Sequence, residues 1–170
     1  MLSTYSTDSA GVPPNAVLLV SARTEDHDVL RGIFRGTRWE LQGASTARGG
    51  LEMVRRHHRE IAVVICEQSL PDGDWKLLLA EMDKTAVRSS LVVSSRLADE
   101  RLWAEVLNLG AFDLLLGAPF EPEEVLRVTE SAWLAWNRAA LPSALQRIGP
   151  GPARSLTAPG ALAPAAGHYI

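Results

Sequence analysis

The sequence predicts one α/β domain with a doubly wound, parallel, five-stranded sheet. Three mainly apolar segments predict strands buried on both faces, at 16–20, 61–66 and 91–95. Segments with apolar residues at helical spacing follow these strands, and this alternation indicates a parallel sheet covered by helices on both faces. Ligands of such folds bind beyond the carboxyl ends of the strands, so the residues just after each strand are where we expect chemistry.

The first two strand-helix units are predicted near the N-terminus. Strand 16–20 is followed by an amphipathic helix that ends at Gly36. Residues 39–43 alternate in polarity and predict a second strand. Ser45 or Thr46 can cap the helix that follows, although two consecutive glycines weaken its first turn.

The third and fourth units follow the same plan. Strand 61–66 leads into a turn, after which Asp74 can cap a helix that runs through Met82. Strand 91–95 precedes a helix that Asp99 begins. The inner stripe of that helix is predicted to hold Leu102, Val106 and Leu109.

The fifth unit completes the domain, and flexible segments are predicted on either side of it. A short strand is expected at 112–116 and a last helix at 121–138, with acidic residues in its first turn. Residues 139–170 hold five of the ten prolines and no acidic residue, which predicts a disordered Pro/Ala-rich tail. Residues 1–15 are also expected to be flexible, so the folded domain is predicted to span 16–138.

Composition excludes several classes of protein. The chain has 170 residues and a formal net charge of −3, which argues against a general nucleic-acid binder. Cys66 is the single cysteine, so the chain has neither an internal disulfide framework nor the thiols of a Cys-based zinc site. No apolar run is long enough to cross a bilayer, and the N-terminus lacks the pattern of a signal peptide. We therefore expect a cytoplasmic protein without membrane contact.

Three sequence blocks stand near the predicted strand ends. In IAVVICEQSLPDGDW, Glu67 stands four residues before Pro71, and LVVSSRLADE places Ser94 near the end of the fourth strand. GAFDLLLGAPF precedes the last helix. In this order the blocks resemble those of response-regulator receiver domains, over roughly residues 16–138. The resemblance implies a CheY-like, flavodoxin-like (βα)5 fold and a role in two-component, phosphorelay-type signal transduction.

Several residues depart from the receiver pattern. Ser21 and Ala22 stand where the family has two acidic residues that hold Mg²⁺, and Mg²⁺ is normally anchored by carboxylates. Glu67 replaces the phospho-accepting aspartate, and Ala118 or the preceding glycine replaces the lysine. Only Ser94 remains as a candidate phosphate ligand. We therefore expect a pseudo-receiver with no metal and no cofactor, which is not an enzyme and is not phosphorylated in the usual way.

Two other functions stay open at this stage. One is a working receiver with unconventional phosphorylation of Glu67 or Ser94, and the other is a small-molecule-binding domain that uses the vacated pocket. Glu67 itself has two interpretations, a fixed mimic of the phosphorylated state or a solvent-facing residue without a role. Asp26 and Asp28 are expected as first-turn helix residues, with a displaced metal site as the alternative.

Three tryptophans point to a partner surface. Trp103, Trp133 and Trp136 fall on the last two predicted helices, at or beyond the margin of their inner faces. The receiver resemblance implies that these helices and the fifth strand bind a protein partner or form a homodimer, because partly exposed aromatic residues often anchor interfaces. The alternative is that the tryptophans only cover the edge of the core. No direct binding of nucleic acid is expected.

Overall fold

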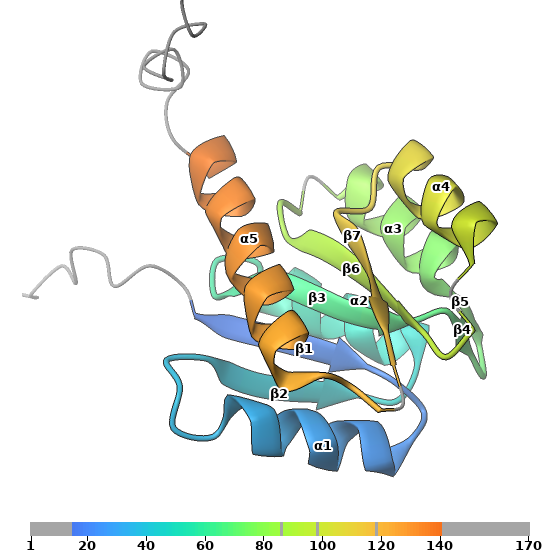
Figure 1. Ribbon diagram of the computed structural model, residues 1–170. Helices are drawn as coiled ribbons and strands as arrows, with labels where there is room; N and C mark the ends of the chain where they lie inside the picture. The colour runs from blue at the N-terminus through green and yellow to red at the C-terminus, as the bar shows by residue number, and fades with distance from the viewer. Residues whose placement is uncertain (1–14, 86, 98, 118, 141–170) are drawn as a thin grey trace, which may run out of the picture.

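A parallel sheet lies between two layers of helices in the computed structural model, which describes residues 15–85, 87–97, 99–117 and 119–140 (Figure 1). Within those residues, five strands form this sheet in the order β2-β1-β3-β6-β7. They are β1 (Ala16–Val20), β2 (Glu40–Ala44), β3 (Ile61–Glu67), β6 (Ser90–Ser95) and β7 (Asp113–Leu116). This is the doubly wound order of flavodoxin-like folds, so the predicted fold class is confirmed.

The helices cover the two faces of the sheet unequally (Figure 1). On one face lie α1 (Thr24–Phe34) and α5 (Pro122–Ala140). On the other face lie α2 (Ala47–Arg56), α3 (Trp75–Lys84) and α4 (Glu100–Asn108). The central strands are buried almost throughout because both of their faces are covered, which explains their mainly apolar sequences.

Three predicted N-cap residues lie at the starts of α2, α3 and α4. The side chains of Thr46, Asp74 and Asp99 each accept a hydrogen bond from the backbone N–H three residues further on, at 3.0, 3.0 and 2.7 Å. Each bond satisfies one of the N–H groups that a helix leaves unpaired at its start. The starts of α2, α3 and α4 are therefore fixed near the carboxyl edge of the sheet.

The structure adds one element to the predicted fold and corrects one expectation. The turn after β3 contains a small antiparallel hairpin, formed by β4 (Ser69–Leu70) and β5 (Gly73–Asp74). Leu109 does not belong to the inner stripe of α4, because the helix has ended and the side chain is 50% exposed. Gly110 follows with a φ of +96°, a backbone conformation that favours glycine and ends the helix there.

The two predicted flexible segments, 1–15 and 139–170, lie largely outside the described residues. At the N-terminal boundary, Asn15 donates a side-chain hydrogen bond to the backbone carbonyl of Arg38 at 2.6 Å. At the other boundary, α5 runs to Ala140, two residues past the predicted end of the domain. No helix in the described part of the chain has the length and apolarity that a membrane span requires.

Candidate functional site

The carboxyl edge of the sheet gathers polar side chains from three strand ends. Ser21 follows β1, Glu67 ends β3, and Ser94 lies near the end of β6. Glu67 and Ser94 are direct neighbours in the parallel pairing of β3 and β6. Side chains that follow neighbouring parallel strands meet at one edge, as the sequence predicted.

Ser21 is the centre of a buried hydrogen-bond network. Its Oγ lies 2.9 Å from Asp26 Oδ2 and 3.0 Å from Glu67 Oε2. A hydroxyl has one proton, so Ser21 donates to one of these carboxylates at a time. The same Oγ accepts a bond from the backbone N–H of Arg23 at 3.1 Å. The serine thus ties α1 and β3 to the end of β1.

Two arginines neutralise the two carboxylates of this network. Arg23 Nε lies 3.1 Å from Glu67 Oε1, and Arg96 Nη2 lies 2.8 Å from Asp26 Oδ1. The Asp26 side chain is only 8% exposed and that of Glu67 16%, so each needs a compensating charge. Arg96 belongs to the loop after β6, and this contact fastens that loop to α1.

Little space is left inside the network. The cavity between Asp26, Glu67 and Ser94 measures about 10 Å³, at the lower limit of what one water molecule needs. A second, shallow cavity of about 150 Å³ lies outside it, along the loop that follows β6. The side chains of the network therefore fill the place where a ligand of the strand ends would lie.

The fold of this chain resembles those of known proteins more clearly than its sequence does. No protein-family model and no curated protein matches the sequence. Among solved structures, a response-regulator receiver domain from Clostridium thermocellum superposes with a TM-score of 0.64 at 18% identity, covering 72% of this chain and 96% of that one. The signal receiver domain of an HD domain-containing protein from Pseudomonas fluorescens has a TM-score of 0.64 at 22% identity, with 73% and 98% covered.

A third solved structure is the CheX-CheY complex with BeF₃ and Mg²⁺ from Borrelia burgdorferi, at a TM-score of 0.65, 21% identity and coverage of 71% and 90%. The chain has the receiver-domain fold. At such low identities the likeness establishes the architecture, while the chemistry has to be argued from the residues of the site.

All but one of the predicted site residues lie within the described residues. Ser21 is buried and Ala22 is exposed. Ser94 is 3% exposed, and within the described residues its hydroxyl makes no hydrogen bond. The Glu67 carboxylate accepts hydrogen bonds from Ser21 and Arg23. This contradicts the interpretation of Glu67 as a solvent-facing residue. Ala118, the expected replacement for the lysine, is outside the part of the chain that the structure describes.

Mg²⁺ does not fit the residues of this receiver-like site. A hard cation prefers several oxygen ligands with uncompensated negative charge, but the carboxylates of Asp26 and Glu67 are each paired with a guanidinium. No group of three or more potential metal-ligating side chains occurs within the described residues. Asp28 adds nothing to the site, because it is exposed and pairs with Arg31 at 2.7 Å.

Sequence reasoning missed three members of the network, namely Arg23, Asp26 as a site residue, and Arg96. A usable signal was present, because Arg96 directly follows the predicted strand 91–95 and Arg23 comes three residues after strand 16–20. Both positions are at the carboxyl edge, where chemistry was expected. Asp26 is a first-turn helix residue, as predicted, but it faces the strand ends.

The three tryptophans have different environments. Trp103 on α4 is 52% exposed. Trp133 on α5 is only 8% exposed and meets Trp39 edge-on at 6.2 Å between ring centroids. The Arg38 guanidinium carbon lies 4.3 and 4.2 Å from the centroids of these two rings. Trp133 therefore fits the alternative in which it covers the edge of the core, because residues leading into β2 cover it.

Trp136 also belongs with the core edge rather than with an interface. It packs against the apolar cluster between α5 and the sheet. Its indole Nε1 is buried, and no partner for it occurs within the described residues. Trp103 is thus the most exposed of the three candidate interface tryptophans.

Trp103 lines a surface groove on α4, β7 and α5. The groove has a volume of about 690 Å³, and Leu114 and Leu116 contribute its other apolar walls. Its charged lining is predominantly acidic and comprises Asp99, Glu100, Asp113, Glu124 and Arg127. An exposed tryptophan beside apolar walls and an acidic rim is typical of a surface that binds another protein.

Proposed function

We propose that this chain is a receiver-like binding module of two-component signalling, which acts through protein-protein contact without phosphorylation at position 67. One observation carries the proposal. Both carboxylates of the site are already paired with arginines, and only about 10 Å³ remains between them. On this proposal the chain is not an enzyme and needs no cofactor.

The chemistry of phosphoryl transfer supports this proposal. Transfer depends on an accessible nucleophile in line with the leaving group and on cations around the transferred phosphoryl group. The Glu67 carboxylate instead accepts hydrogen bonds from Arg23 and Ser21, which reduces its availability as a nucleophile. In the described part of the chain, both carboxylates of the site are paired with guanidinium groups, so neither is free to hold a metal ion there.

The network also favours a single conformation of the domain. Arg96 joins the loop after β6 to Asp26 on α1, while Arg23 joins the start of α1 to Glu67 on β3. These contacts do not depend on a phosphoryl group. We therefore infer that Glu67 helps to hold the domain in one constant conformation. A partner would recognise this conformation by binding at the groove that contains Trp103.

Small-molecule binding at the vacated pocket is disfavoured by its size. Ligand pockets typically have volumes of roughly 300–1,000 Å³, whereas the two cavities that Glu67 and Ser94 line have about 10 and 150 Å³. Unconventional phosphorylation remains the alternative that the following experiment addresses.

The first experiment tests the absence of phosphorylation. The full chain is incubated with acetyl phosphate and Mg²⁺, and its intact mass is measured over time beside that of a receiver domain with the complete acidic set. We expect the mass of this chain to stay unchanged while the control gains one phosphoryl group. A phosphoryl group found on Glu67 or Ser94 would overturn the proposal and favour a working receiver.

The second experiment tests the partner surface. Wild-type chain, Trp103→Ala and Leu109→Ala are immobilised and compared for self-association and for capture of a purified cognate partner, if one is found. Leu109 is the matched control because it is similarly exposed at the end of α4 but does not line the groove. We expect Trp103→Ala alone to lose binding with its fold intact. Binding that survives in Trp103→Ala places the interface elsewhere.

A further inference from the structure

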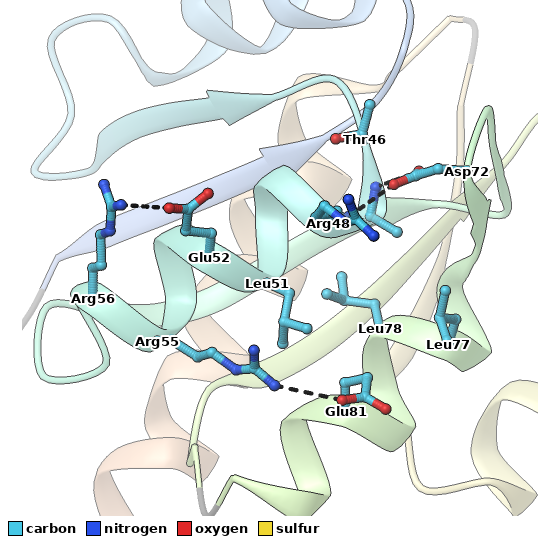
Figure 2. A pocket seen from close by; sticks show the side chains of 11 residues that line it. Thr46, Arg48, Leu51, Glu52, Arg55, Arg56, Asp72, Leu77, Leu78 and Glu81 are labelled. Carbon is cyan, nitrogen blue, oxygen red and sulfur yellow. Dashed lines mark hydrogen bonds and ion pairs between the residues drawn. The ribbon is translucent and has the colours of Figure 1, made fainter.

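A second groove lies away from both the strand-end network and Trp103. It runs between α2 and α3 and has a volume of about 970 Å³ (Figure 2). Leucines from both helices form its apolar walls, with Leu51 on α2 and Leu77 and Leu78 on α3. Leu77 is 46% exposed, so apolar surface is available to an occupant. Nothing in the receiver-like site requires this groove.

Two contacts fix the separation of its walls. At one end, the Asp72 carboxylate accepts hydrogen bonds from the backbone N–H groups of Ala47 and Arg48, at 2.7 and 2.9 Å. This bond joins the β4–β5 hairpin to the start of α2. Further along, Arg55 Nη2 lies 3.4 Å from Glu81 Oε2 across the groove (Figure 2). A groove tied at both ends is preformed, which lowers the entropic cost of binding.

The acidic side chains of the groove are occupied. The two backbone N–H groups lower the pKa of Asp72 below its usual range. The pKa of Glu81 is lowered chiefly by its hydrogen bond to Lys84, whose Nζ lies 2.7 Å away. Glu52 accepts a hydrogen bond from Arg56 one turn further along α2. None of these carboxylates needs a cation from an occupant.

Arg48 and Arg55 still have guanidinium N–H donors that are available to an occupant of the groove. Arg48 is exposed, and its guanidinium forms no ion pair within 4.0 Å among the described residues, although its charge contributes to the lowered pKa of Asp72. Arg55 has one long contact and a side chain that is 48% exposed. A guanidinium has five N–H donors and prefers carboxylates as bidentate partners. The groove therefore suits a carboxylate-bearing occupant.

The positions of these residues set the shape of that occupant. Arg48, Leu51 and Arg55 have the spacing i, i+3, i+7 and share one face of α2. Seven residues of helix correspond to about 10 Å along the axis. An opposing helix with two carboxylates seven residues apart, and leucines between them, would match both the charges and the apolar walls.

We propose that the groove between α2 and α3 binds a short, acidic, amphipathic helix of a partner protein. The leucines of this helix pack on Leu51 and Leu77, and its carboxylates pair with Arg48 and Arg55. This is helix-in-groove recognition, with apolar anchors for affinity and charges for orientation. The inference does not rest on the proposed function, because this surface shares no residue with the strand-end network or with the groove at Trp103.

The probe is a fluorescein-labelled helical peptide with two glutamates seven positions apart and leucines three and four positions after the first glutamate. Its binding to the full chain is measured by fluorescence anisotropy. We expect Arg48→Glu to weaken binding about five- to tenfold, because an attraction becomes a repulsion. Added salt should weaken wild-type binding. A peptide with lysines in place of both glutamates should not bind.

Two further variants separate the groove from general charge effects. Arg101→Glu makes the same charge change at an exposed position of α4 and should bind the peptide as the wild type does. Leu77→Ser keeps every charge and should also weaken binding, because it removes part of the apolar wall. Circular dichroism confirms that each variant is folded.

Several results would overturn the proposal. These are a wild-type chain that does not bind the peptide, an affinity that Arg48→Glu and Leu77→Ser leave unchanged, and equal losses for Arg48→Glu and Arg101→Glu. Sedimentation tests whether a second copy of this chain, rather than a partner helix, occupies the groove. If the chain self-associates and Arg48→Glu abolishes that association while the peptide fails to compete, then a second copy fills the groove and the partner helix is refuted.

Discussion

Arg96 and Asp26 stand 70 positions apart in the sequence and form an ion pair, with Arg96 Nη2 2.8 Å from Asp26 Oδ1. The pair bridges the loop after β6 and the first turn of α1 above the carboxyl edge of the sheet. Its acidic member is nearly buried and its basic member is 39% exposed. The arginine thus balances a carboxylate that water cannot reach well.

Replacing Arg96 by alanine should destabilise the domain more than loss of a surface ion pair does. The variant leaves the Asp26 carboxylate buried with only the Ser21 hydroxyl as a partner. Stranding a buried polar group of this kind costs about 1–3 kcal/mol. Urea unfolding followed by far-ultraviolet circular dichroism measures the free energy of unfolding.

The matched control for that variant is Arg31→Ala. Arg31 pairs with Asp28, and both side chains are more than half exposed. Exposed pairs of this kind contribute about 0–1 kcal/mol. Equal losses in the free energy of unfolding for Arg96→Ala and Arg31→Ala would mean that Arg96 is not needed to stabilise the buried Asp26 carboxylate.

Trp133 and Trp103 offer a second contrast between core and surface. Trp133→Ala should cost about 3–5 kcal/mol, because it leaves a cavity beside Trp39 and removes the ring on which Arg38 stacks. Trp103→Ala should change stability by less than about 0.5 kcal/mol, since the side chain is half exposed. Both are measured by chemical denaturation, and similar losses for the two variants would contradict this division of roles.

The strands and caps were predictable because their signals are local. Each of the three mainly apolar strands lies within one residue of its predicted position, since burial on both faces favours apolar side chains along most of such a strand. Thr46, Asp74 and Asp99 were predictable as caps because an N-cap acts on a backbone N–H only three residues away.

Contacts between side chains that are distant in the sequence could not be predicted from such local signals. Asp26 and Arg96 each stood at a recognisable position, but their contact depends on the paths of two loops that no local pattern specifies. The same holds for Trp133. Helical periodicity placed it at the margin of α5, while its burial comes from Arg38 and Trp39, which precede a strand at the opposite edge of the sheet.

Asp72 should make stability depend on pH in acid. Its carboxylate caps α2 through two backbone N–H groups, which hold its folded-state pKa below the ordinary value of 3.8. A depressed folded-state pKa stabilises the domain above the unfolded value, and that contribution is lost as the pH falls through the folded-state pKa. The difference in Tm between wild type and Asp72→Ala should therefore be largest above about pH 4 and shrink below it.

Thermal melts at a series of pH values between neutral and acid test this linkage. Asp83→Ala is a suitable control, because Asp83 is an exposed acidic residue of α3. A Tm difference for Asp72→Ala that stays constant from neutral pH down into the acid range would show that ionisation of Asp72 does not contribute to the cap.

Cys66 should be unreactive in the folded chain. The thiol is fully buried within β3, and its Sγ lies 3.3 Å from the Glu67 carbonyl oxygen, to which it can donate. Burial raises the pKa of this thiol far above its ordinary value, and the charge of Glu67 raises it further. Because the thiolate is the reactive form, Ellman's reagent at mildly alkaline pH should label the native chain only as fast as it unfolds.

The same reaction in concentrated guanidinium should titrate the one free thiol of the chain. Glu67→Gln separates the two causes of the raised pKa. Because burial is the larger cause and the Glu67 charge the smaller, the folded Glu67→Gln variant should stay nearly as unreactive as the wild type. Rapid labelling of native wild-type chain, at a rate that does not change when denaturant is added, would instead mean that β3 opens readily at its carboxyl end.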